Sequence, residues 1–129
     1  MFSAHKLYSA GYAGFKSYEG EKPFIFISYS HSDANLVFPI IKLLHAYGFR
    51  IWYDWNVKGS YDDYMAELRE HIKKCSVFMY FISHKSLKSS ECIDECNTVS
   101  AIEKNENGEK ISFVLVDLET ITKKKFNLS

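Results

Sequence analysis

Four short apolar runs divide the chain and predict the strands of a sheet. They are rich in β-branched and aromatic residues, which is typical of strands that are buried on both faces. The runs read PFIFISYS at residues 23–30, FRIWYD at 49–54, SVFMYFIS at 76–83 and ISFVLVDL at 111–118. The third run is the most continuously apolar of the four, which predicts a central position for it in the sheet.

Between these runs, apolar residues recur at intervals of three and four, which predicts amphipathic helices. Gly48 ends the first helix, and Pro39 inside it predicts either a helix that begins near Phe38 or irregular first turns. Ser60 and Asp63 resemble a capping box at the start of the second helix. The three predicted helices cover residues 36–47, 60–75 and 90–103.

Strands that alternate with helices predict an α/β fold with a parallel sheet and right-handed crossovers. A length of 129 residues predicts one domain, which we place at residues 23–122. Before it, residues 1–22 form an arm rich in aromatic residues and glycine; this arm either packs against the domain or binds a partner. Residues 123–129 form a Lys-rich tail, and no fifth strand is expected after the fourth run.

Charge and composition exclude several classes of protein. Sixteen basic and sixteen acidic residues cancel, so no overall field attracts a nucleic acid. No apolar run approaches the about 20 residues that span a bilayer, and the start lacks a secretory signal, so we expect no membrane partner and a cytoplasmic location. The three cysteines lack CxxC spacing, which predicts reduced thiols and no metal site.

Polar side chains gather where the predicted strands end. The loops at the carboxyl ends of parallel strands share one edge of a sheet, and ligands bind there. Glu91, Asp94 and Glu95 open the third helix beside this edge, and acids in such a place commonly complement the helix dipole. Glu95 also borders an apolar stripe, so partial burial and a neighbouring acid are expected to raise its pKa.

Familiar catalytic motifs are missing from the sequence. It contains no GxGxxG, GxxxxGK[ST], GxSxG or SxxK pattern, which argues against hydride transfer on a Rossmann fold, P-loop chemistry and serine hydrolysis. A phospho-acceptor domain is disfavoured as well. Asp54 fits the position of its acceptor, but the first run ends in Ser-Tyr-Ser without paired acids.

In this order, KPFIFISYSHSD, GFRIWYD, CSVFMYFIS and SLKSSECIDE resemble a TIR (Toll/interleukin-1 receptor) domain of the bacterial type over residues 22–118. The S-x-x-C-x-x-E pattern of Ser89, Cys92 and Glu95 adds to the resemblance. It implies a flavodoxin-like three-layer sandwich with strand order 2-1-3-4 and self-association with other TIR domains. Many bacterial members of the family cleave the nicotinamide–ribose bond of NAD⁺ in defence or stress signalling, so the resemblance implies this activity as well.

By its place in the motif, Glu95 would be the catalytic glutamate. One carboxylate can suffice, because nicotinamide leaves a cationic pyridinium as a neutral molecule and needs no acid to protonate it. Glu95 would offset the positive charge that develops on the ribose. NAD⁺ is then the substrate, and no further cofactor is implied. The residues implied to bind it are Tyr29, Ser30, His31, Asp54, Trp55 and Ser83.

Two departures from the family pattern leave a second function open. Glu91 stands where many relatives carry an aromatic residue four positions before the glutamate. The loop after the second run lacks the usual Pro-Gly and a following Trp, and Trp55, Tyr61 and Tyr64 are candidates to replace that ring. The chain is therefore expected to be an NAD⁺ glycohydrolase or cyclase activated by self-assembly, with a non-catalytic TIR interaction module as the alternative.

Overall fold

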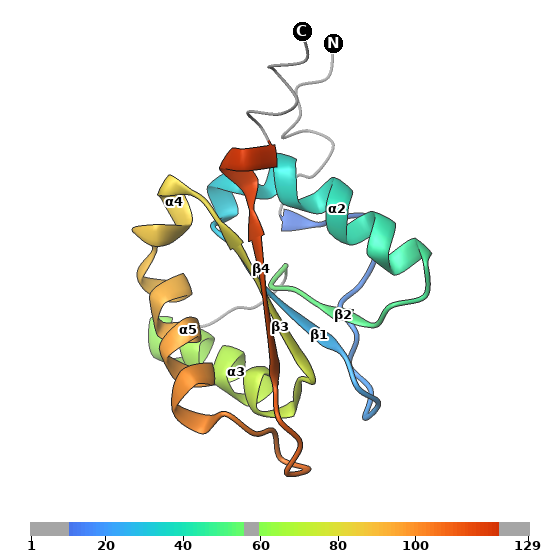
Figure 1. Cartoon of the computed structure of the whole chain (residues 1–129), viewed down its shortest axis with the longest axis vertical. Coiled ribbons are helices and arrows are strands. Elements are labelled where there is room, and N and C mark those ends of the chain that lie inside the picture. Colours follow the sequence, from blue (N-terminus) through green and yellow to red (C-terminus); the bar gives the residue numbers. More distant parts are fainter. Residues whose placement is uncertain (1–10, 56–59, 122–129) are drawn as a thin grey trace, which may run out of the picture.

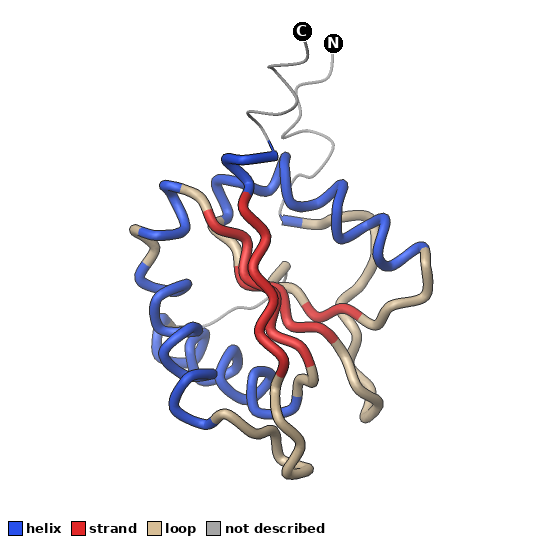
Figure 2. Tube along the Cα trace, in the orientation of Figure 1, coloured by secondary structure: helices blue, strands red, loops and turns tan. Residues whose placement is uncertain are grey.

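The computed structural model describes residues 11–55 and 60–121, which form a parallel four-stranded sheet with helices on both faces (Figures 1 and 2). The strand order is β2-β1-β3-β4, so the predicted α/β flavodoxin-like arrangement is confirmed. The strands are β1 (Ile25–Ser28), β2 (Ile51–Trp52), β3 (Val77–Ile82) and β4 (Ser112–Asp117). The helical elements are η2 (His31–Asp33), α2 (Ala34–Ala46), α3 (Tyr61–Lys74), α4 (His84–Leu87) and α5 (Ser90–Ile102).

Alternation of side chains along the strands builds a separate core on each face of the sheet. Ile25 and Ile27 point toward α2, whereas Phe24 and Phe26 point toward α3 and α5. The core under α2 also contains Phe38, Ile41, Tyr53 and Phe81, and the core under α3 and α5 also contains Trp52, Leu68, Ile72 and Phe78. Because all four strands are parallel, their carboxyl ends lie at one edge of the sheet.

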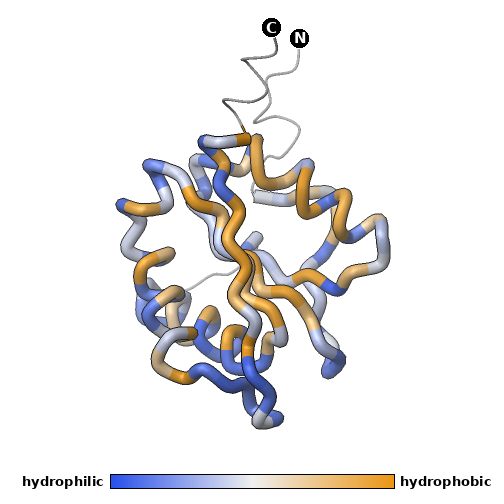
Figure 3. Tube along the Cα trace, in the orientation of Figure 1, coloured by the Kyte–Doolittle hydropathy of each residue, from blue (hydrophilic) through white to orange (hydrophobic). Residues whose placement is uncertain are grey.

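Among the described residues β4 lies at an edge of the sheet, and no fifth strand follows it. Its apolar side chains Phe113, Val114 and Leu115 are exposed, although their sequence is as hydrophobic as that of a buried strand (Figure 3). The prediction that the third run is central is confirmed, since β3 lies between β1 and β4. No helix in the described ranges is long and apolar enough to cross a membrane.

Helix α2 begins earlier than a predicted start near Phe38. It runs from Ala34 with Pro39 inside it, directly after the η2 turn. Proline has no N–H, so it removes one intrahelical hydrogen bond near the start of the helix. Burial of Val37 and Phe38, neither of which is exposed to solvent, supplies apolar contacts that offset this loss.

Strand β2 is shorter than the predicted run at residues 49–54, and the N-terminal arm also binds part of the backbone of this run. The N–H of Tyr18 donates to the carbonyl of Ile51 at 2.8 Å. The N–H of Tyr53 donates to Ser17 Oγ at 3.0 Å, and that hydroxyl donates to the carbonyl of Tyr53. The described part of the arm thus packs along this edge of the domain; residues 1–10 and the Lys-rich tail lie outside the described residues.

Tyr53 is the main anchor of the arm. Its side chain is fully buried, and its hydroxyl accepts from the N–H of Ala13 at 3.0 Å and donates to the carbonyl of Phe15. We expect Tyr53→Phe to lower the free energy of unfolding by about 1 to 3 kcal/mol, because both arm groups lose their partner in a buried place. Urea denaturation measures the loss. Tyr47→Phe, the same change at a largely exposed ring, should leave stability unaltered, and equal results for both variants would contradict the anchoring role.

Candidate functional site

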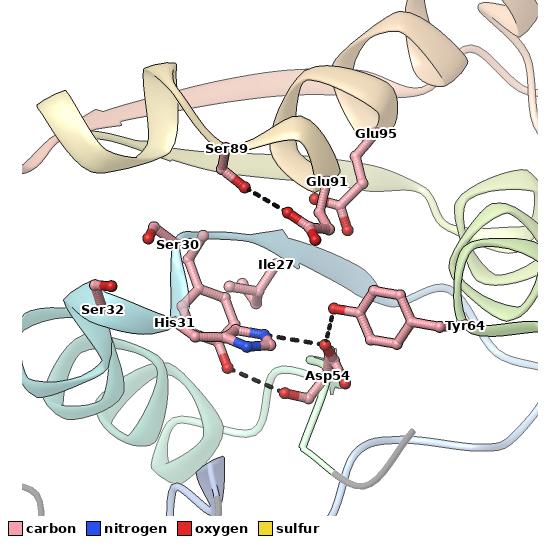
Figure 4. A pocket seen from close by; sticks show the side chains of 10 residues that line it. Ile27, Ser30, His31, Ser32, Asp54, Tyr64, Ser89, Glu91 and Glu95 are labelled. Atoms are coloured by element: carbon pink, nitrogen blue, oxygen red, sulfur yellow. Dashed lines mark hydrogen bonds and ion pairs between the residues drawn. The ribbon is translucent and has the colours of Figure 1, made fainter. Parts of the chain in front are cut away.

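A pocket of ≈ 420 Å³ opens at the carboxyl edge of the sheet, between the segments that follow β1 and β2 and the start of α5 (Figure 4). Parallel strands bring these segments together, which is where ligands bind in open α/β sheets. Polar side chains dominate its wall. The lining residues are Ile27, Tyr29, Ser30, His31, Ser32, Asp54, Tyr64, Ser89, Glu91 and Glu95.

Glu95 reaches the pocket from the second turn of α5. Ser89 caps this helix by accepting from the N–H of Cys92 at 3.3 Å. Cys92 and Val99 are buried against the sheet, which sets the rotation of the helix and brings Glu95 to the border between core and pocket. Only 6% of Glu95 is exposed, and its Oε1 accepts from Ser28 Oγ at 2.7 Å.

Burial raises the pKa of Glu95 to about 8, and the negative charges of Asp54, Glu91 and Asp94 act in the same direction. The hydrogen bond from Ser28 opposes them by favouring the ionised carboxylate. The raised pKa that the sequence predicts is therefore confirmed. A raised pKa favours the protonated form of Glu95 at neutral pH, and a cation placed beside the carboxyl group would favour its ionised form.

Asp54 is the centre of a hydrogen-bonded group on the opposite wall. Its Oδ2 accepts from the hydroxyl of Tyr64 and lies 3.0 Å from Nε2 of His31. Its backbone carbonyl accepts from the hydroxyl of Tyr29 at 3.0 Å. Three side chains from η2, α3 and the end of β1 thus hold one aspartate that is 8% exposed (Figure 4).

The electrostatics of this group favour a cationic histidine beside neutral phenols. The hydrogen bond with Asp54 raises the pKa of His31 and outweighs the opposing effect of burial. Burial, followed by the bond to Asp54, raises the pKa of Tyr64, so its hydroxyl remains a donor. Burial likewise raises the pKa of Tyr29. Nε2 of His31 and Oδ2 of Asp54 lie 3.0 Å apart on one wall, within ion-pair distance, while the carboxyl groups of Glu91 and Glu95 lie on the other.

The structure brings five of the seven site residues named from the sequence to this pocket: Tyr29, Ser30, His31, Asp54 and Glu95. Trp55 instead packs against Tyr12, with ring centroids 4.7 Å apart, and lines a second cavity of ≈ 220 Å³. Ser83 is absent from the pocket lining, because its hydroxyl caps α4 by accepting from Ser86 N at 3.0 Å and donates to Asp33.

The three acids of α5 point in different directions. Asp94 forms an ion pair with Arg69 of α3 at 2.8 Å and does not line the pocket. Glu91 does line it, and its carboxylate accepts from Ser89 Oγ at 3.1 Å and from Ser90 Oγ at 3.3 Å. Glu91 and Glu95 lie one helical turn apart, so the pocket contains a second carboxyl group close to the first (Figure 4).

Some site residues were not identified from the sequence. Of the rings considered as replacements in the second loop, Tyr64 lines the pocket, whereas Tyr61 is mostly exposed. Ser28, beneath Glu95, was predicted to be one of the polar residues at the end of the first strand, beside the cleft, but its bond to Glu95 was not predicted. The alternation along β1 was a usable signal, since Ser28 shares a face with Phe24 and Phe26 and that face meets α5. The loop residues 56–59 lie outside the described residues.

The cysteines do not form a reactive or metal-binding site within the described ranges. No group of three or more His, Cys, Asp or Glu side chains in these ranges is arranged to hold a metal ion. Burial raises the pKa of Cys75 to about 12, that of Cys92 to about 11 and that of Cys96 to about 12. All three are free thiols and remain protonated at neutral pH.

Comparison with known proteins identifies the family. A family model described as TIR domain matches residues 25–128, which include all four strands and the pocket. No significant match was found among curated proteins or among solved structures. The family match covers most of the chain, and the sheet order agrees with the TIR fold. The chain therefore belongs to the TIR domain family.

Proposed function

We propose that this chain cleaves the nicotinamide–ribose bond of NAD⁺, as a glycohydrolase or cyclase in bacterial defence or stress signalling, and that self-assembly activates it. The observation that supports the proposal best is Glu95, a buried carboxyl group that faces a pocket able to admit a ligand at the carboxyl edge of the sheet. TIR domains commonly associate with one another, so other copies of the chain are the partners proposed for activation.

Glu95 acts in this proposal by stabilising charge. The C1′–N bond breaks with its electron pair passing to the nicotinamide ring, which leaves as a neutral molecule, and positive charge develops on the ribose. The ionised carboxylate of Glu95 attracts that charge more strongly in the transition state than in the substrate. Water then adds to C1′ and releases a proton, which gives ADP-ribose; capture by a nitrogen of the adenine gives a cyclic product instead.

The remaining pocket residues would bind and orient the substrate. The hydroxyl of Tyr64, the ion pair of His31 with Asp54, and Ser30 offer donors and acceptors to the ribose hydroxyls. Ring faces at Tyr29 and Tyr64 can contact a nucleotide base. The proposal requires NAD⁺ as substrate and no separate cofactor, and it involves neither a nucleic acid nor a membrane.

The test is incubation of the protein with NAD⁺ over a range of protein concentrations, with nicotinamide and ADP-ribose separated by chromatography. We expect Glu95→Ala to lower the rate of nicotinamide release by about 100-fold or more, because the main stabilisation of the transition-state charge is lost. Glu106→Gln, which removes an exposed carboxylate outside the pocket, should keep the activity within about twofold.

One result would favour the alternative function. If wild-type protein that light scattering shows to be assembled leaves NAD⁺ intact, or if Glu95→Ala equals an active wild type, the catalytic proposal is wrong. In the first of these cases the chain would be a non-catalytic TIR interaction module, and in the second Glu95 would not be its catalytic residue. The observation that favours this alternative is Glu91, whose carboxylate lines the pocket where many relatives carry an aromatic ring.

A further inference from the structure

We propose that Ser28 is a positioning residue: its hydroxyl, held on β1 beneath the pocket, keeps the carboxyl group of Glu95 in the orientation that faces the ribose of NAD⁺. This inference rests on the function proposed above. Ser28 does not line the pocket, so it would act through Glu95 and without contact with the substrate.

The support beneath Glu95 belongs to an interior strand of the sheet. Ser28 is the last residue of β1, which lies between β2 and β3 in the sheet, and it is aligned with Tyr80 in the β1–β3 register. It is completely buried, and its Oγ donates to Glu95 Oε1 at 2.7 Å. No described residue is hydrogen-bonded to Oε2 of Glu95, so the bond to Ser28 turns one oxygen inward and leaves the other for the substrate.

Cys92 lies next to the Ser28 hydroxyl. Its thiol is buried one turn before Glu95, and its interaction with Ser28 lowers the pKa of Cys92 against the larger effect of burial. That interaction favours the thiolate, but burial keeps Cys92 protonated at neutral pH. The Ser28 proton is therefore directed to Glu95, whose Oε1 accepts it at 2.7 Å.

The bond from Ser28 also opposes the charges around Glu95. Asp54 from the segment after β2 and Glu91 and Asp94 from α5 disfavour ionisation of Glu95, as does burial. The bond from Ser28 favours the ionised form. The other titratable groups whose charge interacts with that of Glu95 are Tyr29 after β1, Tyr64 on α3, Tyr80 on β3, and Cys92 and Cys96 on α5.

The test is the pH dependence of kcat/KM for NAD⁺ in wild type and in Ser28→Ala. For the wild type we expect activity to rise as the pH passes through about 8, because the ionised carboxylate of Glu95 is the active form. Ser28→Ala should shift this rise to higher pH. At pH 7 the kcat/KM of Ser28→Ala should be lower than that of wild type by up to about tenfold, because a hydrogen bond to a charged group is lost. The difference between the two proteins should narrow at high pH.

A matched control separates positioning from structure. Ser86 is also a completely buried, hydrogen-bonded serine, but it lies in α4 and outside the pocket. Ser86→Ala should lose about as much stability as Ser28→Ala and keep the wild-type pH profile of kcat/KM. An unchanged profile in Ser28→Ala, or a loss that is equal at every pH, would overturn the inference. Should Ser28→Ala not fold, Ser28→Cys, similar in volume and a weaker donor, is measured in the same way.

A second measurement keeps this inference separate from the proposed function. ¹³C NMR titration of the Glu95 carboxyl carbon, assigned by comparison with Glu95→Gln, reports its pKa without any substrate. A higher pKa in Ser28→Ala would support the role of Ser28 even if NAD⁺ is not cleaved, in which case the proposed function alone fails. An unchanged pKa would overturn the role of Ser28 whether or not NAD⁺ is cleaved.

Discussion

Glu95→Gln is expected to stabilise the protein at pH 8 by on the order of 2 to 4 kcal/mol, although Glu95 is the residue on which the proposed activity depends. Burial raises its pKa from an ordinary value of 4.5 to about 8. Between these two values the unfolded chain releases a proton that the folded chain retains. The contribution of Glu95 to the free energy of unfolding therefore falls as the pH rises. Glutamine has nearly the same shape, can accept the bond from Ser28, and is never ionised.

The measurement is urea denaturation of wild type and Glu95→Gln at several values between pH 5 and pH 8. The free energy of unfolding of the variant should exceed that of wild type by more at each higher pH. The two free energies should approach one another near pH 5. His31 titrates in both proteins, so its effect largely cancels in the difference. Glu106→Gln, the same change at an exposed position, should show no such trend. A constant difference between wild type and Glu95→Gln would contradict the raised pKa.

Phe78→Ala is expected to lower the free energy of unfolding by about 3 to 5 kcal/mol, the largest loss that we predict for this chain. Phe78 is completely buried on β3 and stacks on Phe26 of β1, with ring centroids 5.4 Å apart. On its other side Phe113 of β4 lies 5.1 Å away. Removal of the ring takes away a contact that joins three strands and leaves a cavity beneath α3 and α5, which the rigid sheet cannot close.

Phe49→Ala is the matched control, because it deletes the same ring at a position that is 51% exposed. We expect a loss of about 1 kcal/mol or less for it. Chemical denaturation and the midpoint of thermal unfolding measure both variants. Similar losses at Phe78 and Phe49 would show that the stacked rings do not hold the strands together as the structure indicates.

Most of the fold could be predicted because its signals are local. Each apolar run predicted a strand, and the helical periodicity placed α3 and α5 close to their observed bounds. The differences occur where distant parts of the chain meet. Strand β2 is shorter than its run, and the backbone at Tyr53 beyond it is bound by Ser17 of the arm. Burial of Val37 and Phe38 offsets the hydrogen bond lost at Pro39, so α2 begins earlier than proline alone suggests.

The sequence by itself determined the alternation of strands and helices, the edge at which polar loops gather, and the position of Glu95 in a TIR motif. Hydrophobic periodicity and motifs involve residues that are close together in the sequence, so they can be recognised without the structure. Only the tertiary structure decided which side chains share the pocket. It brought Tyr64 and Asp54 together, placed Ser28 beneath Glu95, and left Trp55 and Ser83 outside. These choices depend on the register between strands and on the rotation of α5, and both are set by packing between segments that are far apart in the chain.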